Sequence, residues 1–255
     1  MDGVGGIAYC IACSVEYFSH PLIRFLHQNY TDTGFKKVQA PKAVFELLSN
    51  YWNSHYEERS KEKWPRGNTY VNHWAASTYM VNVEETSLRG GGYVLKRKIW
   101  EGVKPILEEW TGMELEPSSM YGIRQYTTGA ILSPHADRNP LITSCIINVA
   151  QDVEEDWPLE VYGRDGLAYN VTMKPGDMVL YESHSLIHGR PFPLKGKYFA
   201  NIFVSARCIA YSFTSKRCLR IFADNMVHII SPSQLFCRFI SSQRGSYFGR
   251  EILPY

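Results

Sequence analysis

The sequence has few cysteines, no clustered charge and no long apolar run, and each shortage excludes a class of protein. Six cysteines in 255 residues are too few for a disulfide-stapled scaffold. A net charge of +2, from 27 basic and 25 acidic residues, gives no case for a nucleic-acid partner. No stretch approaches the roughly twenty apolar residues of a membrane-spanning helix, so we expect no membrane span.

Residues 1–20 form a poor signal peptide. The segment begins with Asp2 instead of a basic region, and no leucine-rich core follows. Its Cys10 and Cys13 make a C-x-x-C pair, but no second pair has zinc-binding spacing, so we interpret them as small apolar residues. The sequence leaves the endoplasmic reticulum and the cytoplasm both open as compartments, and it does not fix the oligomeric state.

Two segments have the apolar spacing of amphipathic helices. One begins near Pro41, a residue suited to the first helical turn, and continues to about Arg59. The other covers residues 94–110, contains Pro105 where we expect a bend or a start, and is followed by a glycine that ends it. The β-branched and aromatic residues of 72–83 indicate one or two strands. We therefore predict an N-terminal helical or support region over residues 1–93, with the second helix opening the next domain.

Short β-rich stretches separated by turn residues fill the chain from residue 121 to residue 204, a cadence typical of an all-β barrel or sandwich. The predicted strands are 121–126, 142–149, 157–162, 168–173, 178–181 and 198–204. We predict one barrel domain over residues 94–207. Residues 208–255 show no motif and no clear periodicity, so we predict only a C-terminal extension there.

Within this region one further predicted strand ends on His135, followed two positions later by Asp137. Side chains alternate along a strand with a period of two, so these two residues project from the same face. One imidazole and one carboxylate supply two of the three ligands of a 2-His-1-carboxylate site, which holds Fe(II) and leaves other positions open. A His-x-Asp recurs often by chance, so the third ligand decides its meaning.

The matching half lies roughly fifty residues downstream. A Pro-Gly-Asp turn and a short apolar strand are followed by His184 and His188. Lys197 opens the next predicted strand, where its ammonium group would meet the carboxylate of a bound acid. Arg190 offers a second cation, although its place in a turn favours a surface role. A barrel that folds back on itself would bring the two halves together.

Nine residues of these two halves follow one another in a recognisable order: Arg124, Gln125, Tyr126, Gly129, His135, Asp137, His188, Gly196 and Lys197. In their type, order and spacing they resemble the catalytic domain of the prolyl 4-hydroxylase branch of the Fe(II)/2-oxoglutarate dioxygenases. The resemblance spans about residues 95–204 of this chain.

The resemblance implies a role for each of five residues. His135, Asp137 and His188 would be the iron ligands and form the catalytic centre. Lys197 would pair with the distal carboxylate of 2-oxoglutarate, and Tyr126 would hydrogen-bond this co-substrate.

Two of these assignments, the third metal ligand and the partner of the distal carboxylate, have alternative residues. His188 is preferred to His184 as the third ligand because the Gly-Lys element then falls at the family's distance. In many prolyl 4-hydroxylases the basic residue lies ten positions after the distal histidine, whereas Lys197 lies nine after His188 and Tyr198 holds the tenth position. Arg190 is the alternative partner for the acid.

The resemblance also implies the fold and the activity. The expected fold class is α+β, a double-stranded β-helix (a jelly-roll, cupin-like barrel) with supporting N-terminal helices. The expected activity is that of an Fe(II)- and 2-oxoglutarate-dependent dioxygenase that hydroxylates peptidyl proline with O2, with ascorbate keeping the iron reduced. The alternatives are a sister oxygenase with another substrate and a non-catalytic metal-binding barrel.

Overall fold

The computed structural model describes residues 29–65, 67–138 and 141–209. Its helices are α3 (Lys42–His55) and α4 (Tyr93–Thr111), and a 3-10 turn, η1 (Tyr56–Glu58), follows α3. Its strands are β1 (Phe35–Gln39), β2 (Ser60–Lys61), β3 (Tyr79–Asn82), β4 (Leu115–Ser119), β5 (Gly122–Thr127), β6 (Leu132–His135), β7 (Thr143–Val153), β8 (Leu159–Tyr162), β9 (Ala168–Val171), β10 (Asp177–Tyr181), β11 (His188–Arg190) and β12 (Gly196–Cys208). Residues 1–20, with the Cys10–Cys13 pair, and the extension from residue 210 onward lie outside the described residues.

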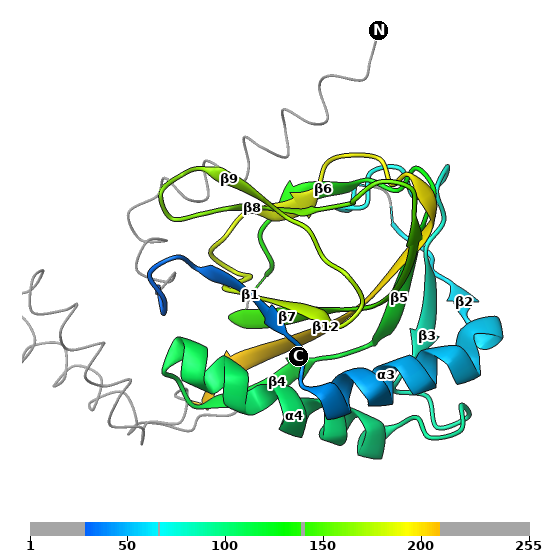
Figure 1. Ribbon diagram of the computed structural model, residues 1–255, viewed down its shortest axis with the longest axis horizontal. Coiled ribbons are helices and arrows are strands. Elements are labelled where there is room, and N and C mark those ends of the chain that lie inside the picture. Colours follow the sequence, from blue (N-terminus) through cyan, green and yellow to red (C-terminus); the bar gives the residue numbers. More distant parts are fainter. Residues whose placement is uncertain (1–28, 66, 139–140, 210–255) are drawn as a thin grey trace, which may run out of the picture. The chain divides into compact units, whose positions relative to one another are not determined.

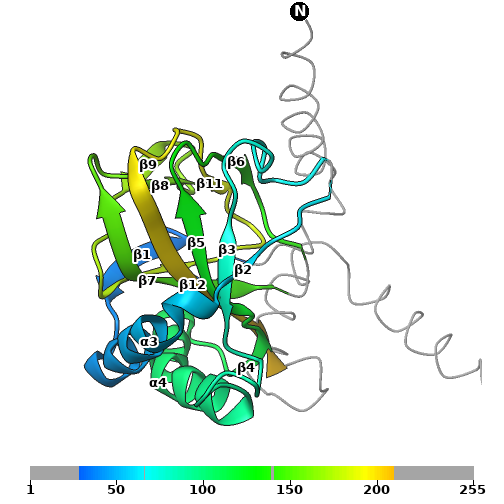
Figure 2. The same ribbon diagram turned by 90° about the vertical axis from the view of Figure 1, so that its right-hand side faces the viewer.

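The strands form two sheets (Figure 1). The larger sheet runs in the order β1-β10-β7-β12-β5-β3-β2, with β4 beside β12, and the smaller runs β6-β11-β8-β9. The smaller sheet lies over one face of the larger, while α3 and α4 lie over the other face (Figures 1 and 2). Two facing sheets with helices on one outer side make the double-stranded β-helix that the sequence predicts, so the predicted fold class is confirmed.

Both helices cover the larger sheet with one apolar stripe, as their sequence spacing predicts. The buried apolar residues are Val44, Leu48, Tyr51 and Trp52 in α3, and Leu95, Ile99, Val103 and Leu107 in α4. α4 runs through Pro105 without ending there. It stops at Gly112, whose left-handed backbone (φ 66°) lets its N–H donate to the Glu108 carbonyl at 2.8 Å.

The segment predicted to be a helical support also supplies strands. β1 pairs along its whole length with β10, and β3 pairs with both β2 and β5. Residues 35–82 are therefore part of the larger sheet itself, and described residues up to Cys208 form one compact unit. The sequence missed β1 because its two apolar residues, Phe35 and Val38, lie three positions apart and show no strand period. Pairing with β10 stabilises the strand.

β12 is longer than its predicted end at Val204. It continues to Cys208 because residues 205–208 pair with β4 on one side, while Ser205 and Ala206 also pair with β7 on the other. Hydrogen-bonded neighbours on both sides keep the strand extended where the sequence alone showed no strand pattern.

Aromatic rings pack the interior between the two sheets. Ring centroids are 5.1 Å apart for Tyr126 and Trp157, and 5.5 Å apart for Trp157 and Phe199. Tyr70 meets Tyr126 at 5.8 Å. All three pairs have the edge-to-face geometry that aromatic rings prefer. Among the residues that the structure describes, no helix is both long enough and apolar enough to cross a membrane.

Candidate metal centre and cavity

His135 and His188 lie on neighbouring strands of the smaller sheet. β11 pairs antiparallel with β6, and the two histidines are direct register partners. Residues opposite one another in such a pair project from the same face. Their ring centroids are accordingly 4.6 Å apart. The strand pairing therefore joins the two halves of the motif that are far apart in sequence.

Asp137 completes the cluster from the segment that follows β6. Its Oδ1 lies 3.7 Å from Nε2 of His135 and 4.0 Å from Nε2 of His188. The three ligand atoms all lie within 4.8 Å of one another. The structure thus brings together the three residues that the sequence selected as metal ligands.

The two imidazoles are prepared to bind a metal through Nε2. Nδ1 of His135 donates to the Ser133 carbonyl at 2.8 Å, and Nδ1 of His188 donates to the Leu186 carbonyl at 2.9 Å, which leaves both Nε2 atoms as acceptors facing Asp137. Burial, and then the neighbouring His188, lower the pKa of His135 to about 4, although Asp137 opposes them. A neutral imidazole is the form that binds metals, so this donor set fits Fe(II).

The turn after β10 holds the segment that carries Asp137. The Asp137 N–H donates to the Ser183 carbonyl at 2.8 Å, and the Ser183 hydroxyl donates to the Leu141 carbonyl at 2.9 Å. His184 is buried, with Nδ1 2.7 Å from the Ile142 carbonyl oxygen. His184 therefore holds the backbone and is not a member of the three-residue metal cluster.

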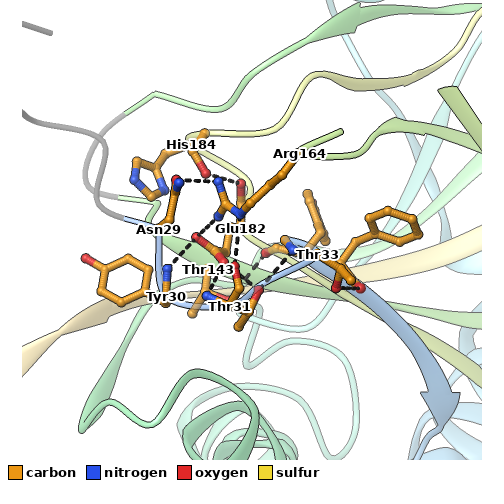
Figure 3. Close-up of polar contacts among 12 residues, drawn as sticks. Asn29, Tyr30, Thr31, Thr33, Thr143, Arg164, Glu182 and His184 are labelled. Carbon is orange, nitrogen blue, oxygen red and sulfur yellow. Dashed lines mark hydrogen bonds and ion pairs between the residues drawn. The ribbon is translucent and has the colours of Figure 1, made fainter. Parts of the chain in front are cut away.

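Glu182, at the start of the same turn, anchors the N-terminal part of the described chain (Figure 3). Its fully buried carboxylate accepts hydrogen bonds from the N–H groups of Tyr30 and Thr31 at 3.0 and 2.9 Å, and it pairs with Arg164. Arg164 also donates to the Thr31 carbonyl at 2.9 Å and to the Asn29 side chain. This anchor fixes β10, which ends on a residue of the cavity wall, Tyr181.

The three ligands open onto a cavity of about 520 Å³ between the sheets. The buried residues that line it, here called its inner wall, include Tyr126, Ile146, Leu159, Tyr181 and Arg190. The partly or fully exposed lining residues, here called its outer wall, include Trp64, Met80, Tyr121, Arg124, Leu141 and Phe203. The Tyr181 ring lies 4.7 Å from the ring of His188. A volume of this size accommodates a small acid together with part of a second molecule.

Tyr126 lies where the sequence predicted it, buried on β5 and lining the cavity. Arg124, two residues earlier on the same face, also lines it. Arg124 donates to both carboxylate oxygens of Glu62 at 2.8 and 2.9 Å, and its guanidinium lies 4.8 Å from the centre of the Trp64 ring. The charge of Arg124 is thus already paired within the protein.

Arg190 is a buried cation of this cavity, which the exposed Arg138 also lines. Its side chain is 2% exposed, and its guanidinium lies 4.6 Å from the Trp157 ring centre and 4.5 Å from the Phe199 ring centre. It donates to the Trp157 carbonyl and the Met173 sulfur, but no acidic side chain among the described residues pairs with it. Burial lowers the pKa of Arg190 to about 10, so it still carries a positive charge at neutral pH.

Lys197 lies outside the cavity, which corrects the placement expected from the sequence. Its side chain is 81% exposed and pairs with Asp152 at 2.8 Å. That pair raises the pKa of Lys197. Lys197 is the second residue of β12, and the pairing of β12 with β7 is irregular beside it, between Gly196 and Tyr198.

The spacing of Arg190 from His188 indicated a place in the cavity, but the predicted turn around Arg190 favoured a surface role. Arg190 stands two positions after His188 on β11, and strand periodicity predicts that the two share a face. Both residues do line the cavity, although the pairing with β6 is irregular between them. Tyr181 had no comparable signal, because its contact with His188 depends on how the two sheets face each other.

No protein-family model matches the sequence, and no curated protein matches it by sequence similarity. Solved structures do match it. A prolyl-4-hydroxylase from Pseudomonas putida superposes with a TM-score of 0.51 at 13% identity, over 78% of this chain and 98% of that one. HygX from Streptomyces hygroscopicus, solved with nickel, 2-oxoglutarate and hygromycin B, superposes with a TM-score of 0.50 at 12% identity, over 70% of this chain and 84% of that one. The chain therefore has the prolyl-4-hydroxylase-like fold of the 2-oxoglutarate oxygenases.

Proposed function

We propose that this chain is an Fe(II)- and 2-oxoglutarate-dependent oxygenase that hydroxylates a peptidyl proline. The observation that carries the proposal is one cavity holding both a His135, Asp137, His188 cluster and the unpaired cation of Arg190. The first group suits a divalent iron, and the second suits the far carboxylate of a dicarboxylic acid.

The metal-binding groups have separate tasks. The two histidines present Nε2, and Asp137 presents one carboxylate oxygen, so three ligands occupy one side of an ion and leave its cavity side open. Iron in such a site supplies the O2 chemistry by which a 2-oxo acid is oxidatively decarboxylated and a C–H bond is hydroxylated. The protein's own part is to fix the ligands, orient the two organic substrates and exclude water.

Arg190, and not Lys197, is the residue that we assign to the co-substrate. A buried guanidinium without an anionic partner is unfavourable, and a carboxylate reaching it would form a charge-assisted pair in a site of low dielectric constant. Tyr126 lines the same inner wall and supplies a hydroxyl for the acid, as the resemblance implies.

The proline substrate is supported by the residue resemblance and by the outer wall of the cavity. Trp64, Tyr121 and Met80 give that wall an apolar and aromatic surface that suits a pyrrolidine ring. The second candidate is an oxygenase of the same chemistry with a different substrate, because HygX shares the fold and its structure contains hygromycin B. Ascorbate would keep the iron reduced in either case.

The first experiment is succinate release by the purified chain with Fe(II), 2-oxoglutarate, O2 and ascorbate, with and without a proline-rich peptide. Turnover stimulated by the peptide supports the full proposal. Turnover without stimulation keeps the oxygenase and favours the second candidate.

His135→Ala and Asp137→Ala test the metal centre in the same assay. Both variants should lose turnover and metal binding, measured with Co²⁺ by absorption spectroscopy, while far-UV circular dichroism stays unchanged. The matched control is His73→Ala, a partly exposed histidine outside the cluster, which should keep both properties. Metal binding without turnover in the unmodified chain would instead favour a non-catalytic barrel.

A further inference from the structure

Arg138 directly follows Asp137 in the chain, lines the same cavity and is exposed. The backbone is held on both sides of its side chain. The Asp137 N–H donates to the Ser183 carbonyl at 2.8 Å, and the Arg138 carbonyl accepts from the Leu141 N–H at 3.1 Å. The guanidinium of Arg138 therefore extends from a fixed backbone position, one residue from a metal ligand, where the cavity opens to solvent.

Arg138 carries the charge of this cavity that the proposed function leaves uncompensated. Arg124 is paired with Glu62 at 2.8 Å. The charges of a divalent cation and of Arg190 are balanced by Asp137 and a dianionic 2-oxo acid. No acidic side chain among the described residues pairs with Arg138, and Asp137 is the only acidic residue among those that line the cavity. The opening of the loaded cavity is therefore positive and attracts anions.

The surface that Arg138 shares is the one that the proposed function gives to the target proline. Tyr121 is 57% exposed, and Trp64 and Met80 are partly exposed, and all three line the cavity with Arg138. Consecutive Cα atoms of an extended peptide are about 3.8 Å apart. A residue one or two positions from a proline bound in this cavity thus lies within reach of a long side chain that starts beside Asp137.

We propose that Arg138 determines substrate specificity by pairing with an aspartate or glutamate side chain one or two positions from the target proline. The inference rests on the proposed function and names the class of peptide that the site takes, an acidic one. The planar guanidinium presents parallel N–H groups to the two oxygens of a carboxylate, which adds orientation as well as attraction. A basic residue at the same place in the peptide is repelled.

Three capped peptides test the inference. They have the sequence Ac-Ala-X-Ala-Pro-Ala-X-Ala-NH2, with aspartate, asparagine or lysine at both X positions. Their binding to the chain loaded with Ni²⁺ and 2-oxoglutarate is measured by isothermal titration calorimetry at low ionic strength. The unmodified chain should bind the aspartate peptide about fivefold more tightly than the asparagine peptide, as expected for an exposed ion pair, and the lysine peptide least tightly. Added salt should reduce the preference, because it screens exposed charges.

Substitutions of Arg138 assign the preference to this side chain. Arg138→Gln should bind the three peptides alike, Arg138→Lys should keep a preference for aspartate, and Arg138→Glu should prefer the lysine peptide. A reversed preference does not arise from a folding defect, because a misfolded chain would lose all three peptides. The matched control is Arg89→Gln, which removes the same charge from an exposed residue outside the cavity lining and should keep the preference.

The KM for 2-oxoglutarate distinguishes the peptide from the co-substrate as the partner of Arg138. It should stay within twofold in Arg138→Gln, while the KM for the aspartate peptide rises about fivefold. A raised KM for 2-oxoglutarate with an unchanged peptide preference would assign Arg138 to the co-substrate and overturn the inference.

The outcomes separate this inference from the proposed function. If the unmodified chain releases succinate but binds the aspartate and asparagine peptides alike, or if Arg138→Gln keeps the preference, the function stands and the inference is overturned. If the chain releases no succinate with any peptide, the proposed function fails, and calorimetry alone decides the role of Arg138. A preference for aspartate that Arg138→Gln abolishes then supports an acidic-peptide site, and equal binding of the peptides overturns it.

Discussion

His188 lies directly opposite His135 in the antiparallel pairing of β11 with β6, and Nδ1 of each ring is fixed by a backbone carbonyl two residues earlier in its own chain segment. The hydrogen bonds that orient the two imidazoles therefore come from the backbone. Because both orienting bonds use main-chain oxygens, the position of the metal ligands depends on strand pairing more than on neighbouring side chains.

Gly189→Ala should disturb the metal centre without touching a ligand. A Cβ at Gly189 would lie 2.8 Å from the backbone N and Cα of Pro134 and 2.9 Å from the Leu132 carbonyl oxygen, so β11 would have to move away from β6. We expect at least a tenfold loss in Co²⁺ affinity, in line with the effect of disturbing groups that orient metal ligands. Ser133→Ala on the opposing strand adds no atom and should retain the affinity. Unchanged affinity in Gly189→Ala would show that the pairing does not fix His188.

Arg190→Met and Lys197→Ala compare the two candidate partners of the acid. Arg190→Met removes the buried charge but keeps an unbranched apolar stem, and should raise the KM for 2-oxoglutarate by at least tenfold, because the acid loses a charge-assisted pair. Lys197 is exposed and paired with Asp152, so Lys197→Ala should leave the KM within twofold. Steady-state kinetics measures the KM for 2-oxoglutarate in both variants. A raised KM in Lys197→Ala with an unchanged KM in Arg190→Met would show that Lys197 binds the co-substrate.

Glu182→Ala should destabilise the fold by about 3 kcal/mol, because it leaves Arg164 without its buried partner and two N–H groups without an acceptor. Urea unfolding followed by tryptophan fluorescence measures the change. Glu155→Ala is the matched control, since Glu155 pairs with Lys195 at the surface and its loss should cost less than 1 kcal/mol. Equal losses in the free energy of unfolding for the two substitutions would show that the buried contacts of Glu182 do not stabilise the fold more than a surface ion pair does.

Asp177 should make the fold sensitive to acid. Burial alone would raise the pKa of Asp177, but hydrogen bonds from Lys37, the Lys174 N–H and Gln39 outweigh it and hold the pKa below its usual value. A carboxylate with a lowered folded pKa stabilises the protein above its unfolded pKa of about 3.9, and this stabilisation is lost as the pH falls toward the folded value.

Asp177→Asn should therefore cost about 1–2 kcal/mol at neutral pH, and the difference from the unmodified chain should shrink below about pH 4. Urea unfolding at a series of pH values measures it. The exposed Asp32→Asn serves as the control and should leave the free energy of unfolding unchanged at neutral pH. If the difference in free energy of unfolding between Asp177→Asn and the unmodified chain stays constant down to acid pH, the pKa of Asp177 is not lowered in the folded chain.

The sequence determined the local elements whose pattern is repeated along the chain. The apolar spacing of α3 and α4 and the continuous β-rich or apolar runs of β7 and β10 require no distant partner to be recognised. The His-x-Asp pair and the spacing to His188 indicated the ligands because strand periodicity alone places two of them on one face. β1 was missed because it depends on β10 for its pairing.

Only the tertiary structure decided which cation faces the interior. Arg190 and Lys197 are both basic, both near His188 and both next to turns, so local sequence does not separate them. The register of β11 against β6 carries Arg190 inward between two aromatic rings, whereas the irregular start of β12 leaves Lys197 in solvent beside Asp152. Burial follows from how the two sheets face each other, which depends on contacts between residues far apart in the chain.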